Sequence, residues 1–500
     1  MSRAIGVLLV ILLLVVYAGA LRAVISRPFR ALGILVAGMA VHNFVLMVLI
    51  RLDTPHVLIR LIQAWKEGLL LLLFGLVAVQ AYRFWRARQW PALRPVDWLM
   101  IAYTGVVVVY AMLPGSLLHS NIDISHRLLG LRILVLIPGL YLFGRVFMPR
   151  DRADLRWVAG LVLGSAALVG AFGLVELWLV PTVRWIDWGV NDLSAWLGFT
   201  YHGPAGLPEN FFQATSEGLL LRRMVSTYVS PLGIAYTGLL VVPIGIATLY
   251  AKRPFASLPW WLPAVMLNLA LLGILFSVTR LALAVLVAEA ALLYVLLRRR
   301  TLVLITVLLA GAVLFMFIGY PRIGPVVDRN LQAVTNRGVL HLASGSDPSA
   351  HEHLTELIQD FAFVRQHPLG AGLGASLHRF GATSGGTGES AVFDVFGEIG
   401  IVGGIIYLLL YLAALVYGLR AFWPRRRDLL IAAFPLAVLV GGLALVPITF
   451  TSDVWADFSV TFLFWWAFGY GVSLAEGARD AEVLPHAPPG RFSEPDALVI

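Results

Sequence analysis

Long apolar segments recur along the whole of this 500-residue chain, and they restrict its fold more than any other feature. Hydrophobic residues make up 59% of the sequence and charged residues only 13%. Segments of about 17 to 25 such residues are long enough to cross a bilayer of roughly 30 Å as helices. Because backbone polar groups need partners inside lipid, these segments must be helical. The sequence therefore predicts an all-α, polytopic membrane protein.

We predict thirteen spans, with twelve as the alternative because the first two segments are the least distinct. No sequence repeat relates the two halves of the chain, which argues against a transporter built from duplicated units. The predicted spans lie near residues 4–24, 31–50, 67–85, 97–113, 128–148, 157–178, 223–250, 259–277, 281–297, 301–319, 391–418, 428–448 and 454–474.

The net charge of +9 comes from short basic clusters between the apolar segments, which is typical of positive-inside topology rather than of a nucleic-acid-binding face. The absence of cysteine excludes disulfides and thiolate metal sites. The polar tail, residues 476–500, is expected to be disordered and cytoplasmic, so residues 1–475 form the membrane domain. The clusters expected in the cytoplasm are residues 83–94, 144–156, 251–253, 298–300 and 425–427.

Two long loops, residues 179–222 and 320–390, then lie on the periplasmic side. In the second loop, apolar residues at helical spacing predict an amphipathic helix that begins after Asp347 and ends before Pro368. The glycine-rich stretches that follow it, "LGAGLGA" and "GATSGGTGES", are expected to be flexible. No strand precedes "GAGLGA" and no Lys-Ser/Thr follows it, so a hinge is favoured over a nucleotide-binding loop.

Two other patterns have alternative explanations. In "HEH", His351 and His353 point about 200° apart on a helix and cannot share one ion, so no metal site is expected. A hydrogen bond from His353 to a polar ligand is favoured instead. Tryptophans in the first long loop could stack on sugars, but an interfacial belt is the better interpretation. They are Trp185, Trp188 and Trp196.

Cations cluster where several spans meet the side opposite the basic loops. Arg280 separates two apolar spans, so it must lie in a tight hairpin at that surface. Its guanidinium could extend to the membrane surface and cap a helix end, or it could bind a phosphate group through two parallel N–H donors. The residue alone does not favour one alternative over the other. Four spans carry such polar residues, which indicates an anionic ligand. The others are Lys66, Arg132, Arg222, Arg223 and Tyr228.

Three acids, Glu389, Asp394 and Glu398, run directly into a predicted span. The helix dipole explains an acid at the first position but not one three turns into the helix. We therefore expect one of them to act as a base beside the bound anion. A fourth acid, Glu289, lies near the middle of a span, and an ion pair with Arg132 is its leading explanation.

Four stretches together resemble the O-antigen ligase and O-antigen polymerase family of bacterial membrane glycosyltransferases. They are "RMVSTYVSPLGIAYTGLL", "FSVTRLALAVL", "HLTELIQDFAFVRQHPLGAGLG" and "ESAVFDVFGEIGIVGGIIYLL". Arg280 matches the essential arginine of the family, and Glu398, Gly400 and Gly403 match its E-x-G-x-x-G pattern. The resemblance covers residues 223–418 well and the first 200 residues mainly in hydropathy. Glu389 stands where the ligases usually carry a histidine, and His353 stands where the loop helix often carries arginine.

The resemblance implies a GT-C-like membrane enzyme that needs neither metal nor other cofactor and inverts the anomeric centre. Its donor is a glycan on undecaprenyl pyrophosphate, and its acceptor is a sugar hydroxyl at the periplasmic face of the bacterial inner membrane. The resemblance implies catalytic roles for Glu389, as the base, and for Arg280. Asp394 and His353 are the further candidates for the base. The implied substrate-binding residues are Lys66, Arg132, Arg222, Arg223, Tyr228 and Glu398.

The function expected is polymerisation of surface-polysaccharide repeat units, with a chain-length regulator and a flippase as partners. An O-antigen ligase, which transfers glycan to a lipid A core, is the first alternative. A peptidoglycan polymerase of the shape-and-division type matches the hairpin arginine and the outer loop less well. A flippase or exporter of lipid-linked sugars needs charges through the whole membrane depth, and here Glu289 is the main one.

Overall fold

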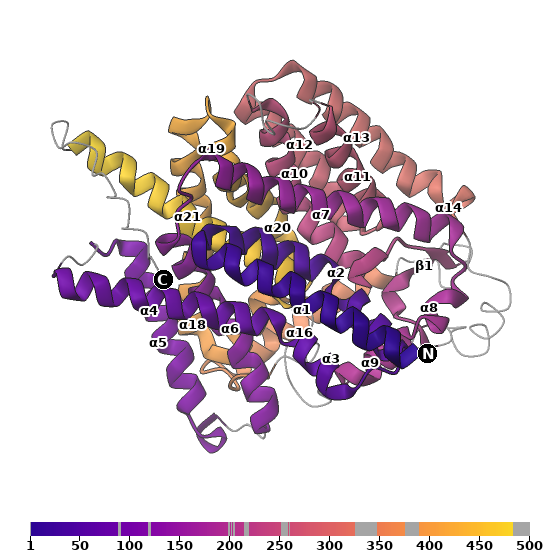
Figure 1. The fold of residues 1–500 in the computed structure, drawn as a ribbon, viewed down its shortest axis with the longest axis horizontal. Helices are drawn as coiled ribbons and strands as arrows, with labels where there is room; N and C mark the ends of the chain where they lie inside the picture. Colours follow the sequence, from indigo (N-terminus) through magenta and orange to yellow (C-terminus); the bar gives the residue numbers. More distant parts are fainter. Residues whose placement is uncertain are drawn as a thin grey trace.

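The chain folds into a helical membrane protein (Figure 1). This computed structural model describes residues 2–88, 92–118, 122–198, 201, 203, 206–214, 220–251, 259, 261–325, 348–375 and 390–483. Within them, 12 helices are long and apolar enough to cross a membrane, which confirms the all-α, polytopic prediction. A further apolar helix, α11 (Leu262–Phe276), has 15 residues and corresponds to the predicted span 259–277, so it is shorter than the other twelve.

The span helices are joined by short connections except after α7 and after α13, where the two predicted long loops lie. Helices α19 and α20 are joined by a π-helical turn, η6 (Ala437–Gly441), into a single candidate span. The span helices are α1 (Ser2–Ser26), α2 (Ala31–Arg51), α4 (Trp65–Ala87), α5 (Pro95–Met112), α6 (Ile124–Val146), α7 (Arg152–Leu179), α10 (Pro231–Tyr250), α12 (Arg280–Leu297), α13 (Arg300–Ile318), α18 (Ala391–Arg425), α19 (Leu429–Leu436) with α20 (Gly442–Thr449), and α21 (Phe458–Val483).

Short elements lie between these helices. The only described sheet has two antiparallel strands, β1 (Phe212–Ala214) and β2 (Leu220–Arg222), with Phe212 opposite Arg222. The others are η1 (Pro28–Arg30), α3 (His56–Gln63), η2 (Gly115–Leu118), α8 (Val183–Asp187), α9 (Val190–Leu197), η4 (Glu209–Phe211), η5 (Ser226–Tyr228), α14 (Tyr320–Ile323), α16 (Pro348–Gln366) and η7 (Val454–Ala456).

The core is formed by α10, α19–α20 and α21, which are largely buried, whereas α1 and α4 are mostly exposed. Helices α6 and α21 pack with their backbones in close contact. A side chain at Gly144 would meet the carbonyl oxygen of Trp466 at 2.1 Å, and one at Gly469 would meet that of Tyr141 at 2.1 Å. Small residues allow helices to approach this closely in membranes, where no hydrophobic force drives them together. This packing holds the middle of α21 against α6.

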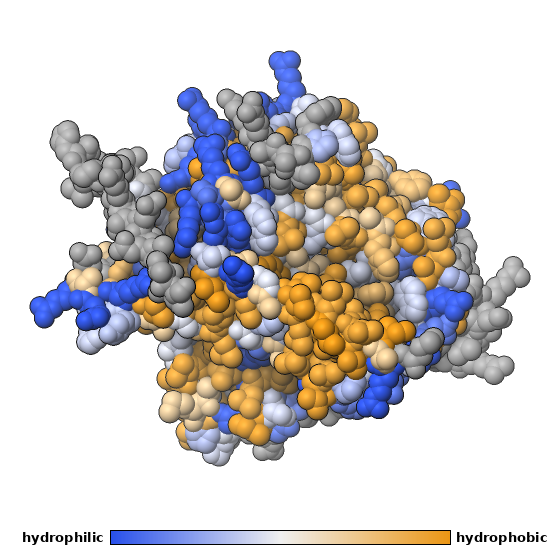
Figure 2. Space-filling view, in the orientation of Figure 1, coloured by the Kyte–Doolittle hydropathy of each residue, from blue (hydrophilic) through white to orange (hydrophobic). Residues whose placement is uncertain are grey.

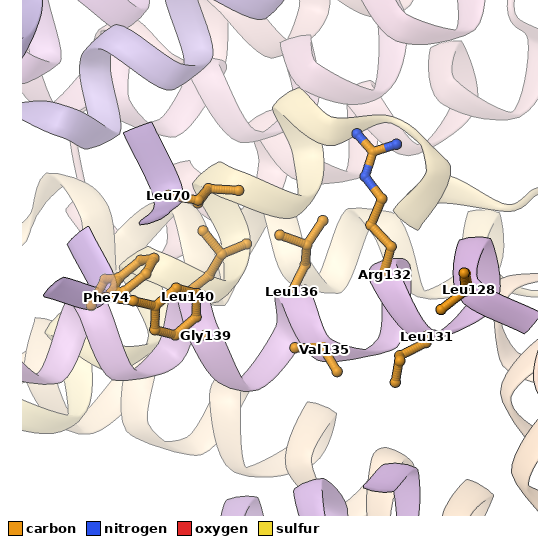
Figure 3. A pocket seen from close by; sticks show the side chains of 10 residues that line it. Leu70, Phe74, Leu128, Leu131, Arg132, Val135, Leu136, Gly139 and Leu140 are labelled. Carbon is orange, nitrogen blue, oxygen red and sulfur yellow. The ribbon is translucent and has the colours of Figure 1, made fainter. Parts of the chain in front are cut away.

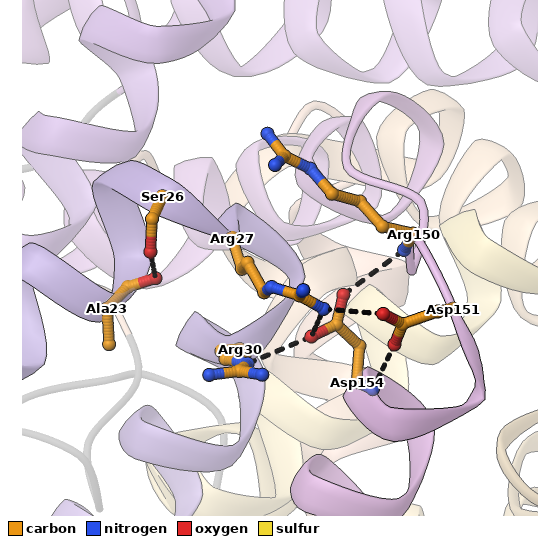
Figure 4. A network of polar contacts seen from close by, with 7 residues as sticks. All are labelled: Ala23, Ser26, Arg27, Arg30, Arg150, Asp151 and Asp154. Atoms are coloured by element: carbon orange, nitrogen blue, oxygen red, sulfur yellow. Dashed lines mark hydrogen bonds and ion pairs between the residues drawn. The ribbon is translucent and has the colours of Figure 1, made fainter. Parts of the chain in front are cut away.

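An ion-pair network joins the turn between α1 and α2 to the start of α7 (Figure 4). Asp154 accepts hydrogen bonds from Arg27 at 3.0 Å and from Arg30 at 2.9 Å, and Asp151 accepts another from Arg27 at 2.8 Å. The Arg27 guanidinium holds the pKa of Asp151 below its usual range. The first two predicted spans are therefore a helical hairpin that is tied to the body of the protein.

Ion pairs of this kind gather at one end of the helix bundle, which we call the basic end. Arg94 pairs with Glu476 and Arg152 with Asp428, so the predicted cytoplasmic clusters meet there. Figure 2 shows a broad apolar surface over α1 between hydrophilic side chains at the upper left and a smaller hydrophilic group at the right. We call the opposite end the site end. It contains residues 52–64, 220–230, 277–279 and 450–457.

Several predicted elements are found with shifted limits. The predicted loop helix is α16, Pro348–Gln366, as the sequence indicates. The span predicted to start at residue 223 begins at Pro231, because Ser230 caps it by accepting a hydrogen bond from Gly233. Helix α21 continues to Val483, beyond the predicted tail boundary at 476, since residues 474–483 are mostly good helix formers.

Orientation in the membrane can be tested by thiol labelling, because the chain has no native cysteine. Ala64, at the site end, and Ala87, at the basic end, are both exposed. By the positive-inside rule, we expect a membrane-impermeant maleimide added to spheroplasts to label Ala64→Cys and not Ala87→Cys. Labelling of Ala87→Cys alone would reverse the proposed topology.

Candidate functional site

Arg223 and Arg280 lie near each other at the site end, where α12 begins. The Arg223 guanidinium donates to the carbonyl oxygen of Ser277 at 2.7 Å and to the hydroxyl of Thr279 at 2.8 Å. Both acceptors are neutral and leave the charge of Arg223 uncompensated. Burial lowers the pKa of Arg223 to about 10, with Tyr236 opposing this effect and Arg280 adding to it. Two half-buried cations held this close together are suited to bind an anion with several oxygens.

The backbone around these arginines is strained. Val278, in the hairpin between α11 and α12, has φ of 51°, and Val229 has φ of 56°. A β-branched residue in the left-handed region is an outlier that costs roughly 1–3 kcal/mol. Such conformations persist only where the surrounding structure imposes them. The hairpin predicted from Arg280 is thus present, and its shape is enforced by the packing around it.

Arg222 points away from this pair. Its guanidinium donates to Glu176 of α7 at 2.7 Å, and Glu176 also accepts a hydrogen bond from the Trp185 indole at 3.0 Å. All three side chains are buried. We therefore assign Arg222 a structural role instead of the substrate-binding role predicted from the sequence. Trp185 also proves to be a core residue, and not part of an interfacial belt.

The Arg222–Glu176 pair makes a stability prediction. Glu176→Leu leaves a buried arginine without its counter-charge, and we expect a loss of roughly 3–5 kcal/mol in the free energy of unfolding. The double variant Glu176→Leu/Arg222→Met should recover most of the lost free energy of unfolding. Denaturation in detergent measures both. The exposed pair Arg184–Asp187 is the control, since Arg184→Met should cost less than about 1 kcal/mol. Equal losses in both pairs would contradict the structural assignment.

Asp457, just before α21, is a candidate site residue that sequence reasoning missed. Its carboxylate accepts a hydrogen bond from the Ser459 backbone at 3.0 Å, and the Ser459 hydroxyl accepts one from Tyr228 at 3.1 Å. Burial raises the pKa of Asp457 to about 7, although the side chain keeps part of its surface exposed. Its Oδ2 would lie 2.9 Å from a side chain at Gly233, one helical turn along α10 from Tyr236. The only sequence signal was an acid at the start of a span.

Lys66 and Arg132 form a second group of cations at the same end. Both lie over the ring of Phe458, Lys66 at 5.7 Å and Arg132 at 5.0 Å from its centroid. Glu67 forms ion pairs with both. Lys66 is buried and also approaches the His42 ring at 3.4 Å. The predicted convergence of cations therefore takes the form of two groups, one near Asp457 and α10 and the other over Phe458.

The "GAGLGA" stretch is packed against a kink in α18 and is not the flexible hinge expected from its composition. Gly400 has φ of 72° and interrupts the helix, and Gly370 also has φ of 72°. A side chain at Gly370 would meet the Gly400 nitrogen at 2.6 Å. Backbone hydrogen bonds join Ala371 to Gly397 at 2.7 Å and Ile401 to Pro368 at 2.9 Å. The glycines provide positive φ and close backbone approach.

The remaining predicted residues are distributed as follows. Asp394 and Glu398 are fully buried in α18 before the kink, unlike the half-buried Asp457. Glu289 is buried in α12 without a hydrogen-bond partner among the described residues. Arg132 pairs with Glu67, so the expected Arg132–Glu289 pair is wrong. Glu389 lies outside the described residues, and of His353 only the backbone, in α16, is described.

No family model matches the chain, and no curated protein matches it. Within the described residues, 12 helices could span a membrane. The chain is a multi-pass, all-α membrane protein with two groups of cations and a half-buried acid at one end.

Proposed function

We propose that this protein is a glycosyltransferase that moves a glycan from polyprenyl pyrophosphate to a sugar hydroxyl, and that it polymerises surface-polysaccharide repeat units. One observation carries the proposal: Arg223 and Arg280 lie close together with neutral oxygens around Arg223, and α10 links them to the half-buried Asp457. Tyr236 of α10 is the residue that interacts with Arg223, and Gly233 of α10 is the residue that lies against Asp457. The two are one turn apart, roughly 5 Å along the helix.

The chemistry follows from these positions. The acceptor hydroxyl oxygen attacks the anomeric carbon of the donor, and its proton passes to the Asp457 carboxylate. The bond between that carbon and the pyrophosphate oxygen breaks, and polyprenyl pyrophosphate leaves with both bonding electrons. Charge grows on the leaving oxygens, and the half-buried Arg223 and Arg280 stabilise it. Attack opposite the leaving group needs a single base.

A second base remains a candidate. The sequence favours Glu389, which lies outside the described residues, and the structure adds Asp457. One proton transfer requires one base, so single variants of the two acids separate the alternatives. The raised pKa of Asp457, about 7, suits a general base near neutral pH, which is why we place it in that role.

The pKa of Asp457 leads to a pH prediction. An acid whose pKa is raised to about 7 is mostly protonated at pH 6 and mostly ionised at pH 8. Only the ionised form accepts a proton, so kcat/KM for transfer should rise about tenfold per pH unit below the pKa and level off above it. A pH profile of the purified protein measures this. A profile that is flat between pH 5 and pH 8 would contradict Asp457 as the base.

The biological function is tested by deleting the gene in the native host and separating the surface glycan on a gel. We expect the ladder of long chains to disappear while one repeat unit remains attached. Loss of all attached glycan, with intact polymer left on the carrier lipid, would instead indicate a ligase. An unmodified surface glycan would rule out both enzymes.

A further inference from the structure

Beyond the Arg223–Arg280 pair, the structure contains an apolar groove between α4 and α6 with a cation in its lining (Figure 3). The groove has a volume of about 330 Å³, and among the described residues that line it Arg132 alone is charged. Figure 3 shows the Arg132 side chain extending from α6 on one side of the apolar residues, away from Phe74. The apolar lining includes Leu70, Phe74, Leu128, Leu136 and Gly139.

Arg132 belongs both to the lining of the groove and to the second group of cations. Lys66, Leu70 and Phe74 are spaced four residues apart and lie on one face of α4, just as Leu128, Arg132 and Leu136 do on α6. Lys66 and Arg132 thus lie nearer the site end than most of the apolar lining, although Leu128 lies one turn beyond Arg132 at that end. From Arg132 to Phe143, α6 extends roughly 16 Å. This pattern fits a lipid with an anionic head group and a long apolar chain.

Two neighbouring residues at the start of α21 have different surroundings. Asp457 lies against Gly233 of α10, whereas its neighbour Phe458 lies under Lys66 and Arg132. A reaction centred on Asp457 can therefore draw one substrate from each side. The two charge groups also differ, since Glu67 partly neutralises the group over Phe458. The group over Phe458 therefore carries the smaller net positive charge.

We infer that the α4–α6 groove is the binding site of the acceptor, and that the acceptor is itself a lipid-linked repeat unit. Its prenyl chain occupies the apolar groove, and its pyrophosphate binds Lys66 and Arg132. This inference rests on the proposed function, in which Arg223 and Arg280 hold the pyrophosphate of the donor. It identifies the acceptor as a polyprenyl pyrophosphate, which is what a polymerase requires.

Native mass spectrometry of the purified protein with undecaprenyl pyrophosphate tests the inference. We expect two lipids per chain for the wild type, one for the double variant Lys66→Gln/Arg132→Gln, and one for Arg280→Gln. The control is Arg60→Gln, which removes an exposed cation of α3 outside the groove and should leave two lipids bound. Undecaprenol, which has no phosphate, should not bind specifically.

The outcomes separate the two proposals. If the wild type binds one lipid and only Arg280→Gln abolishes it, the groove is not a second site, while the proposed function stands. If the double variant still binds two lipids, the groove assignment is overturned. If no lipid binds to the wild type, the proposed function itself fails.

A kinetic variant tests the groove without altering its cations. A side chain at Gly139 would come within 2.9 Å of the Phe74 ring, so Gly139→Leu fills the groove. We expect the KM for the lipid-linked acceptor to rise roughly 10- to 200-fold while the KM for the donor stays unchanged. Thermal denaturation confirms that the variant is folded. An unchanged acceptor KM in a folded Gly139→Leu variant would contradict the assignment.

Discussion

Replacement of Asp457 by asparagine is expected to reduce the rate of glycan transfer roughly 100- to 10,000-fold, the loss typical of a missing general base. The amide keeps the size of the side chain and its hydrogen bond from the Ser459 backbone but cannot accept the proton. Binding of the donor should survive, because Arg223 and Arg280 hold its pyrophosphate. Single-turnover transfer from a purified lipid-linked donor, measured beside donor affinity, gives both quantities.

Two further variants make this result specific. Asp453→Asn removes an acid from the same loop, four residues earlier, and should leave the rate near that of the wild type. Glu389→Gln tests the residue favoured by the sequence. A normal rate in Asp457→Asn together with a large loss in Glu389→Gln would transfer the role of base to Glu389. Equal losses of rate and affinity in Asp457→Asn would make Asp457 a binding or helix-capping residue.

Arg280→Lys is expected to lower the transfer rate roughly 100- to 1,000-fold, the loss found when one donor to a developing negative charge is removed. Lysine keeps the charge but loses the two parallel donors that match a phosphate group. The protein should still insert and fold, because Arg280 is the first residue of α12 and keeps part of its surface exposed. The same single-turnover assay measures the effect.

Arg322→Lys is the matched control for that variant. Arg322 lies in α14 at the same end of the bundle, is exposed, and has no role in the proposed site. Its replacement should leave the rate unchanged. If Arg280→Lys transfers glycan as fast as the wild type, Arg280 provides only a generic positive charge or anchors the hairpin.

The spans were predictable because lipid leaves a chain few choices. Every backbone group in the membrane needs an internal partner, so a long apolar segment must be a helix whatever its neighbours are. The hairpin at residues 277–279 was predictable for the same reason, since Arg280 cannot lie in the middle of an apolar span. Helix α16 also appears as predicted, because Pro348 and Pro368 mark its ends.

The roles of individual charges depend on contacts between distant segments, which the sequence does not reveal. Arg222 and Arg223 are neighbours, yet Arg222 ends β2 and binds Glu176, whereas Arg223 binds the hairpin before α12. Successive residues of an extended segment point to opposite sides, so the two side chains separate. Asp457 was missed because its importance comes from the packing of α21 against α10, 200 residues away in sequence.

The central claim, that the site end transfers a glycan between lipid carriers, is tested most directly by one reconstituted reaction. The purified protein is placed in nanodiscs with a defined undecaprenyl-pyrophosphate oligosaccharide and no nucleotide sugar. We predict that free undecaprenyl pyrophosphate and a lipid-linked glycan of twice the length form in equal amounts. Intact donor at the end of the reaction, with wild-type protein that is folded and binds the lipid, would contradict the account.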